Sequence, residues 1–351
     1  MKKTCIIIPT YNQEESTIRC FDSVSKNTEN YKIIWVDNGS DKKSVDKVKN
    51  FLDNESVPYK LIRNEKNLGF IKATNQGIKE SLVSDCDYVV FMNNDIEVYS
   101  EWLDRIIKIA NKDKKNGIIG PISSNGTWMQ SIDYLPKQYP DIFSSIPKYK
   151  NNPEIYSNIV KNKYQGVTRE IFSHVAFFCT LLKRETVEDV GYLSEELGMG
   201  YFDDNDYCER ALRKGWKIFI CADVFVLHSH GKTFKNKFSH DEKMKIYNKN
   251  KKIFEKKFNK GGYDKPIDEI DDIGELRLEV KRLKESVKKE KFNYRKLLRL
   301  TGGKLKNNTR ENILIRIFRF WKLKKLYIKY KNKIFFGLLS PRKFLKKYFK
   351  I

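Results

Sequence analysis

The stretch Tyr88-Val89-Val90-Phe91-Met92-Asn93-Asn94-Asp95 is a short apolar run that stops at a polar triplet ending in a carboxylate. Five apolar residues bounded by polar ones predict a buried strand of a parallel sheet. Ligands of open α/β sheets bind beyond the carboxyl ends of the strands, so this pattern brings Asp95 to the mouth of a crevice. A carboxylate there suits a Mg²⁺ or Mn²⁺ ion that bridges two phosphates. Taken alone, the triplet is also explained as an ordinary turn, because Asn and Asp are common turn residues.

Polar residues also follow the earlier apolar runs of the chain. Strands are predicted over residues 5–8, 32–36 and 59–62, with helical spacing over 14–24 and again beyond Phe70. Because strands that alternate with helices form parallel βαβ units with right-handed crossovers, the carboxyl ends of the strands meet at one edge. We therefore expect a slot at this edge, lined by small polar side chains: Thr10, Asp37, Asn67 and Asp95.

Short motifs follow one another in order from the first strand onward. They occupy residues 9–12, 36–40, 67–70, 75–77, 93–95, 120–125, 178–184, 190–193, 202–210 and 226–231. Over roughly residues 3–260 the chain resembles the family 2 glycosyltransferases, most of all bacterial rhamnosyltransferases and galactofuranosyltransferases. The resemblance implies an α/β fold of the GT-A type. That fold is a Rossmann-like, mostly parallel central sheet flanked by helices, and a C-terminal helical extension follows it here.

The resemblance also implies a reaction and its binding residues. The reaction is inverting transfer of a sugar from a UDP- or dTDP-sugar to a hydroxyl of a glycan or lipid-linked glycan, in the assembly of a surface polysaccharide. Contacts to the nucleotide-sugar map onto Pro9, Thr10, Tyr11, Asp37, Asn67, Asn94 and Asp95. Among these, Asp37 accepts from the imide of the base and Asn94 lies near the ribose. Uracil and thymine share that imide, so the two donors are not separated.

A divalent cofactor, Mn²⁺ or Mg²⁺, is implied together with the donor. The resemblance maps its ligands onto Asp95 and His228. From the residues alone, His228 follows the apolar run 224–227, which places it at a strand end where a neutral imidazole can bind a metal. His230 is an alternative ligand two residues later, whereas His174 and His240 have no comparable context. The triplet carries Asn93 where the family usually has a first aspartate, which removes one carboxylate.

The segment 203–206 is the densest acidic cluster of the chain and precedes helical spacing. One explanation of these acids is structural, because a helix dipole and helix capping both favour acidic residues at a helix N-terminus. An inverting transfer also needs a carboxylate that takes the proton of the acceptor hydroxyl. The resemblance gives this role to Asp204, with Asp203 as the alternative, and Asp206 is expected to orient the helix or contact the acceptor. Crowded carboxylates raise each other's pKa, which suits a base.

Charge is distributed unevenly along the 351 residues. The chain has a net charge of +24, and residues 275–351 hold 26 Lys and Arg against 5 Glu, which leaves +3 for the first 274 residues. A near-neutral body with a basic tail favours an anchoring or docking tail over general nucleic-acid binding. We expect a GT-A domain over 1–265, a coiled-coil or helical linker over 266–300 and a basic amphipathic helical tail over 301–351.

The two C-terminal segments predict partners. Apolar residues at heptad positions over 273–297 favour a homodimeric coiled coil, with a single docking helix as the alternative. Residues 313–335 place aromatic and aliphatic side chains on one helical face and basic ones opposite, which is typical of a helix lying on an anionic membrane surface. We therefore expect a cytoplasmic protein that is peripheral at the inner face of the cell membrane, with no nucleic-acid partner.

Two other functions were weighed against glycosyl transfer. A nucleotidyltransferase also uses an α/β nucleotide fold, but no glycine-rich loop with arginine and lysine follows the first strand. A nucleic-acid-binding protein would depend on the tail alone. The six cysteines show no Cys-x-x-Cys spacing, which argues against a zinc site, and several lie in apolar runs, as free buried cysteines do in a reducing cytosol. The stretch 127–164, rich in Tyr, Pro, Asn and Ser, is expected to be an irregular loop, with Trp128 available to stack on the acceptor sugar.

Overall fold

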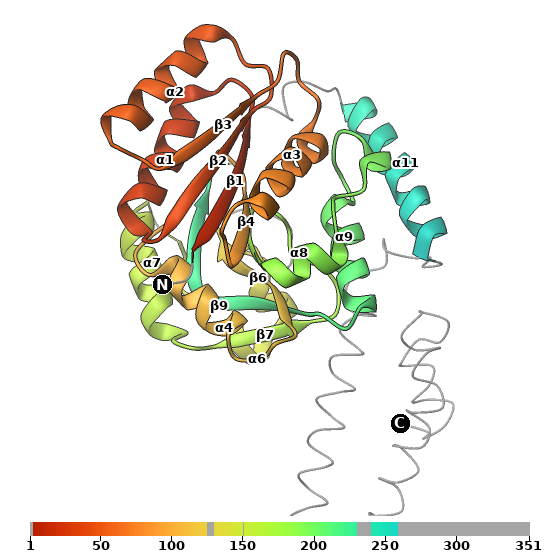
Figure 1. Ribbon diagram of the computed structural model, residues 1–351. Helices are drawn as coiled ribbons and strands as arrows, with labels where there is room; N and C mark the ends of the chain where they lie inside the picture. The colour runs from red at the N-terminus through yellow and green to blue at the C-terminus, as the bar shows by residue number, and fades with distance from the viewer. Residues whose placement is uncertain (1–2, 125–129, 150, 230–239, 259–351) are drawn as a thin grey trace, which may run out of the picture. The chain divides into compact units, whose positions relative to one another are not determined.

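The structure is a computed structural model, and it describes residues 3–124, 130–149, 151–229 and 240–258 (Figure 1). Its strands are β1 (Thr4–Thr10), β2 (Tyr31–Asp37), β3 (Tyr59–Arg63), β4 (Tyr88–Met92), β5 (Ile96–Glu97), β6 (Asn116–Ser123), β7 (Thr168–Ile171), β8 (Cys179–Lys183) and β9 (Lys217–His228). Its helices are α1 (Glu14–Asn27), α2 (Lys42–Asn54), α3 (Phe70–Val83), α4 (Trp102–Ala110), α5 (Leu135–Gln138), α6 (Pro140–Phe143), α7 (Pro153–Lys163), α8 (Arg184–Val190), η1 (Glu195–Leu197), α9 (Asp203–Arg213) and α11 (His240–Phe258).

The strands form one sheet in the order β3-β2-β1-β4-β8-β6-β9-β5, with β7 paired to β9. The first four strands of this order run parallel, as the sequence predicts. The chain steps outward from β1 to β3 and then returns to β4, so right-handed crossovers place α1 and α2 on one face and α3 on the other (Figure 1). This reversal creates a switch point between β1 and β4, where open α/β sheets bind ligands.

The second half of the sheet is mixed. Strand β8 runs antiparallel between β4 and β6, while β6 and β9 pair in parallel. The two-residue strand β5 pairs antiparallel with the end of β9, so that Ile96 lies opposite His228. The α/β fold of the GT-A type that the sequence predicts is confirmed by this sheet and its flanking helices.

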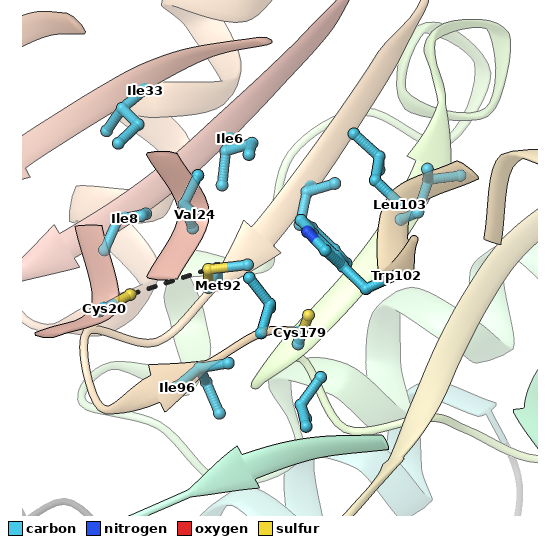
Figure 2. Close-up of a cluster of buried hydrophobic side chains, with 14 of the residues drawn as sticks. Ile6, Ile8, Cys20, Val24, Ile33, Met92, Ile96, Trp102, Leu103 and Cys179 are labelled. Carbon is cyan, nitrogen blue, oxygen red and sulfur yellow. Dashed lines mark hydrogen bonds between the residues drawn. The ribbon is translucent and has the colours of Figure 1, made fainter. Parts of the chain in front are cut away.

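The hydrophobic core fills the space beneath the parallel strands on the side of α1 and α4. Figure 2 shows Ile6, Ile8, Val24, Ile33, Met92 and Trp102 in this cluster, where Cys20 contacts Met92 with 3.8 Å between the sulfur atoms. Trp102 is 1% exposed and still satisfies its indole N–H, which donates to Thr28 Oγ1 at 2.9 Å. A close-packed core of this kind fixes the strand ends that carry the polar residues.

Two sequence expectations are wrong. The stretch expected to be an irregular loop contains α5, α6 and the eleven-residue α7. Asn152 caps α7 by accepting from Ile155 N at 3.0 Å, Pro153 opens it, and Tyr156 packs on Phe225 of β9 with ring centroids 4.7 Å apart. Tertiary packing and a local cap therefore override the turn-like composition.

The second correction concerns the cysteines. Cys20, Cys179, Cys208 and Cys221 are free and buried, as expected. Cys5 and Cys86 instead form a disulfide between β1 and the residues just before β4. The two lie 81 positions apart in the sequence, so only the pairing of β1 with β4 brings them together.

The C-terminal predictions lie outside the described residues. Met1–Phe254 forms one compact unit and Glu255–Ile351 a second, and of the second unit only the end of α11 is described. The boundary at 265, the segment 266–300, the coiled coil at 273–297 and the tail at 301–351 therefore stay predictions, and Trp128 and His230 are not described either. In the described ranges, no helix has both the length and the apolar character needed to cross a membrane.

Candidate active site

The ends of β1 and β2 meet where the sequence predicts a nucleotide slot. Thr10 and Asp37 are register partners, and both are buried. The Asp37 side chain is fully buried, and its Oδ1 accepts from Ser40 N at 3.3 Å. Its Oδ2 accepts no hydrogen bond from the part of the chain that the structure describes and lies 3.4 Å from Arg63 Nε, whose side chain is partly exposed. Asp37 thus offers a carboxylate oxygen that an N–H donor of a ligand can use.

The loops after β1 and β2 hold each other in place. Asn12 and Gln13 both adopt left-handed backbone conformations, with φ of 51° and 57°. Asn12 N donates to Ser40 Oγ at 2.7 Å, and Asn12 Oδ1 accepts from Asp41 N at 3.1 Å. Pro9 and Tyr11 are half-buried beside this turn. Strained left-handed residues persist only where contacts such as these overdetermine them, which is typical of ligand-binding loops.

Asn38 organises the loop before α3, a role that its position in the 36–40 motif did not reveal. Its Oδ1 accepts from Leu68 N at 2.9 Å and from Asn64 Nδ2 at 3.1 Å. Its Nδ2 donates to Asn67 Oδ1 and to Gly69 O, each at 3.2 Å. A buried amide that uses both its donors and its acceptor fixes backbone over a long sequence separation. The loop before α3 is therefore held in place at this end of the candidate slot.

Three predicted contact residues have side chains engaged within the protein. Thr10 Oγ1 accepts from Trp35 Nε1 at 2.8 Å, and Asn94 Nδ2 donates to Thr17 Oγ1 at 2.9 Å. Asn67 Oδ1 accepts from Gly69 N at 2.9 Å as well as from Asn38. These residues hold the rim of the slot, whereas the carboxylates of Asp37 and Asp95 keep oxygens available to a ligand.

Asp95 and His228 are brought together by the pairing of β5 with β9. His228 Nε2 lies 3.4 Å from Asp95 Oδ1, and their side chains are 11% and 6% exposed. Ser124 Oγ accepts from His228 N at 3.0 Å, and the imidazole packs against Phe178 with ring centroids 5.3 Å apart. Ser229 N donates to Asp95 O at 3.0 Å, which fixes the backbone on the other side. The predicted metal ligands therefore face each other, although 133 positions separate them in the sequence.

The environment of Asp95 fits a divalent cation. Both of its carboxylate oxygens are buried, and neither accepts a hydrogen bond from the described residues. Buried polar groups normally form hydrogen bonds, so we expect these two oxygens to bind a positively charged group that arrives with the substrate. Across the described ranges, no group of three or more His, Cys, Asp or Glu side chains could hold a metal on its own. One carboxylate and one imidazole suit Mn²⁺ or Mg²⁺ when a diphosphate and water complete the coordination.

The acidic cluster lies at the start of α9, as the sequence predicts. Tyr201 and Phe202 enter the helix with φ of 64° and 67°, and α9 begins at Asp203. Burial and the neighbouring Asp204 carboxylate raise the pKa of Asp203 to about 7. Burial raises the pKa of Asp204 to about 6, although Asp204 Oδ1 accepts from Asn205 N at 2.8 Å. A carboxylate with such a pKa is a stronger base than an ordinary aspartate and is still ionised near neutral pH.

The loop that carries these acids is held by α11. Asn250 is 1% exposed, and its Nδ2 donates to Leu197 O and Gly200 O, each at 2.7 Å. Phe254 packs on Phe202 with ring centroids 5.5 Å apart. Asn250 is a supporting residue that the sequence did not single out. Its neighbourhood is lysine-rich and weakly patterned, so no local signal marks it.

Asp206 has a structural role in the first turn of α9. Its Oδ2 accepts from Arg210 Nε at 2.8 Å and from Ser194 Oγ at 2.6 Å. Arg210 in turn donates to Val190 O and Tyr192 O, at 2.6 and 2.7 Å. This network ties α9 to the segment after α8, in agreement with the expectation that Asp206 orients the helix.

His174 contacts the acidic turn, although no motif around it in the sequence marks it as a site residue. Its Nδ1 lies 2.9 Å from Asn205 Nδ2 and 3.0 Å from Ser173 Oγ. Asn205 also donates its backbone N–H to Asp204, so the imidazole supports the residue beside the candidate base. The contact joins the loop before β8 to α9, and no spacing in the sequence encodes it.

Comparison with known proteins relates the sequence of this chain to one family. The model of the family described as glycosyl transferase family 2 matches residues 5–191. The dTDP-rhamnosyl transferase RfbF of Shigella flexneri is 27% identical over 225 residues, which cover 64% of this chain and 68% of RfbF. Glycosyltransferase AglE of Haloferax volcanii is 25% identical over 232 residues, which cover 64% of this chain and 66% of AglE.

Among solved structures, the mannosyltransferase PcManGT from Pyrobaculum calidifontis, in complex with GDP-Man and Mn²⁺, is also similar. It shares 15% identity, and the TM-score is 0.48. The similarity covers 66% of this chain and 58% of PcManGT.

Proposed function

This chain belongs to the family 2 glycosyltransferases, and from that premise we propose that it transfers a sugar, with inversion, from a UDP- or dTDP-sugar to an acceptor hydroxyl. The single observation that carries the proposal is Asp95. Its two buried oxygens accept no hydrogen bond from the described residues and lie beside His228, at the switch point of the sheet. A nucleoside diphosphate with a divalent ion supplies the positive partner that this carboxylate needs.

The donor base would be recognised at Asp37. The N3–H of uracil or thymine would donate to Asp37 Oδ2, which accepts no hydrogen bond from the described residues. Arg63 beside it carries N–H groups that can donate to a carbonyl of the same base. This acceptor-plus-donor edge complements an imide flanked by carbonyls. The Asn38 network keeps the edge in place, so little entropy is lost when the nucleotide binds.

A divalent ion would be held by Asp95 and His228 together with the diphosphate. When bound, such an ion neutralises the charge that develops on the departing nucleoside diphosphate. Both side chains are nearly buried, so the protein around them limits where an ion could bind. Ser124 and Phe178 fix the imidazole from two sides, which limits its motion.

Asp204 would act as the base, with Asp203 as the alternative. The acceptor O–H bond breaks and its proton passes to a carboxylate oxygen as the acceptor oxygen attacks the anomeric carbon. The bond from that carbon to the diphosphate breaks on the opposite face, which inverts the anomeric configuration. A raised pKa supports this role, because a carboxylate with a pKa of about 6 takes up a proton more readily than an ordinary aspartate.

The acceptor and its location are inferred from the sequence of the tail. A glycan or lipid-linked glycan for a surface polysaccharide suits an enzyme that works at the inner face of the cell membrane. The +21 charge of residues 275–351 and the apolar face of 313–335 support attachment to an anionic surface. A homodimer through residues 273–297 would place two tails on the same membrane.

Thermal unfolding of the full-length protein with nucleoside diphosphates tests the donor proposal. UDP, dTDP, GDP and ADP are each added with and without Mn²⁺. A ligand at about 100 times its Kd stabilises the folded state by about 2.7 kcal/mol, so a specific ligand gives a clear rise in Tm. We expect UDP or dTDP to give the largest rise and Mn²⁺ to increase it. Equal shifts with purine nucleotides, or no shift with any of them, would overturn the proposal.

A further inference from the structure

A groove runs along α3 on the face of the sheet opposite α1 and α2. It has a volume of about 520 Å³ and lies between α3 and the segment after α8. Its lining includes Lys72, Gln76 and Lys79 on the helix, and Tyr192, Leu193 and Glu195 across from it. None of these residues is used by the reaction proposed above, so the groove is a separate feature of the fold.

The groove presents two unpaired ammonium groups. Lys72 and Lys79 are exposed and seven positions apart, so they share one face of α3 about 10 Å apart along its axis. Within the described ranges, neither ammonium forms an ion pair or a hydrogen bond. Two lysine ammonium groups beside one groove, neither of them paired with the Glu195 carboxylate on the opposite wall, favour an anionic ligand, and phosphate is an anion that lysine commonly binds.

The opposite wall suits a sugar ring. Tyr192 is 47% exposed, which is uncommon for a large aromatic side chain that lies against a groove. An aromatic face packs on the apolar side of a sugar ring, while the phenol keeps its hydrogen-bonding group in water. Glu195 adds a carboxylate that accepts hydrogen bonds from sugar hydroxyls. The groove therefore combines phosphate-binding and sugar-binding side chains.

The walls are fixed before any ligand arrives. Asn75 is 8% exposed, and its side-chain amide forms two hydrogen bonds with the backbone of Leu193. Asn75 Oδ1 accepts from Leu193 N at 2.8 Å, and Asn75 Nδ2 donates to Leu193 O at 3.0 Å. Its Nδ2 also donates to Glu195 Oε1 at 3.2 Å. Gln76 exchanges two hydrogen bonds with Asn64, each of 2.8 Å. Preorganised walls lower the entropic cost of binding.

One wall of the groove is tied to the first turn of α9. Ser194, between the lining residues Leu193 and Glu195, donates its hydroxyl to Asp206 Oδ2 at 2.6 Å. At the other end, a Cβ built on Gly69 would lie 3.1 Å from Met199 Sδ, so the loop before Asp203 packs closely on the start of α3. The groove wall and the start of α3 are therefore both packed against the segment that leads into α9.

We propose that this groove binds the phosphate-bearing part of the acceptor, with a sugar on Tyr192 and phosphate between Lys72 and Lys79. The inference rests on the proposed glycosyl transfer and names the acceptor class as a phosphorylated glycan. Binding energy from this remote site would hold the reacting hydroxyl at Asp204. Two sources supply this chemistry: a lipid-linked glycosyl diphosphate and a polyol phosphate chain.

Calorimetric titration of the full-length protein tests the proposal with defined probes. The probes are hexyl diphosphate-linked glucose, a glycerol phosphate oligomer and hexyl glucoside without phosphate. We expect at least one phosphorylated probe to bind at least about tenfold more tightly than the glucoside, and the tighter of the two identifies the source. The double variant Lys72→Ser with Lys79→Ser should lose about tenfold in affinity, about threefold per lysine. Tyr192→Ala should weaken all sugar-bearing probes.

A matched control separates local binding from general charge effects. Lys42 and Lys49 on α2 are also exposed, seven positions apart and unpaired within the described part of the chain. Replacing both by Ser removes the same charge and should leave probe binding unchanged. Equal losses in the two double variants, or no preference of the wild type for phosphorylated probes, overturn the inference.

The same protein samples distinguish a failure of this inference from a failure of the proposed function. UDP and dTDP titrations of the groove variants should match the wild type, because none of the substituted residues lines the nucleotide slot. If no nucleotide binds the wild type, glycosyl transfer is wrong whatever the probes do. If nucleotides bind and the phosphorylated probes do not, only the groove assignment is wrong.

Discussion

Replacing Asp95 by Asn should stabilise the ligand-free protein while it abolishes sugar transfer. Both Asp95 oxygens are buried without a hydrogen bond from the described residues, and His228 Nε2 lies 3.4 Å from Oδ1. Leaving a buried polar group unsatisfied costs about 1–3 kcal/mol, and a charged group costs more. The amide of Asn carries no net charge, so we expect the variant to gain about 1–3 kcal/mol of stability.

The gain is large enough to measure as a change in Tm. For a domain of this size, each kcal/mol changes Tm by about 2–4 °C, so Asp95→Asn should unfold about 2–12 °C above the wild type. Scanning calorimetry of the full-length protein without metal gives this value. Mn²⁺ with UDP should then raise the Tm of the wild type and leave that of the variant almost unchanged, because the variant lacks the anionic ligand.

Asp85→Asn is the matched control for this substitution. The Asp85 side chain is 93% exposed, and its contact with Lys3 is at the surface. Removing its charge should change Tm by little, since exposed ion pairs contribute at most about 1 kcal/mol. The sign of the Asp95 result decides the reasoning. A loss of about 3–5 kcal/mol would mean that Asp95 forms a compensated buried pair with a protonated His228, and the account of an unsatisfied carboxylate would be refuted.

Three further results are expected. Asp204→Asn should bind the nucleotide normally and lower kcat by about 10²–10⁴-fold in a transfer assay; if Asp203→Asn shows this loss instead, the base is Asp203. Transfer should fall on the acid side with an apparent pKa between about 6 and 7, from the raised pKa values of Asp204 and Asp203. Both pKa values exceed the ordinary 3.8, so between about pH 4 and 7 the folded state binds more protons than the unfolded state. The free energy of unfolding should therefore decrease as the pH rises through this range. Chemical denaturation of the double variant Asp203→Asn with Asp204→Asn should show a weaker dependence on pH. Gly39→Ala should lower the free energy of unfolding by more than about 1 kcal/mol and weaken UDP binding. The reason is that Gly39 has a φ of +86° and that the new Cβ would lie 2.6 Å from the backbone carbon of Lys66. An unchanged urea unfolding curve would contradict this expectation.

The elements of the parallel half were predictable because their signals are local. Apolar runs that end in polar residues gave β1, β2 and β4, and the stripe of α1 begins at Glu14 in both sequence and structure. The acidic first turn of α9 was predictable for the same reason, because the acidic residues at the start of this helix are neighbours in the sequence. Parallel topology then follows from alternation and crossover handedness.

The contact between the two candidate metal ligands could not be predicted from local sequence patterns. Strand ends alone could not say that Asp95 faces His228, because the contact depends on the antiparallel pairing of a two-residue strand with β9. The family resemblance supplied the pairing, and the geometry agrees with it. The resemblance gave no role to His174, whose contact with Asn205 arises from a loop with no periodic pattern.

The sequence by itself determined the strands and helices of the parallel half, the polar strand ends and the acidic turn, because periodicity and capping act over a few neighbouring residues. Tertiary structure alone decided the hydrogen bonds of Asn38, the disulfide between Cys5 and Cys86, and the groove beside α3. Each of these joins segments that are distant along the chain. Such contacts exist only after the sheet has brought strands and loops together, and no local pattern encodes which of the available polar groups will meet.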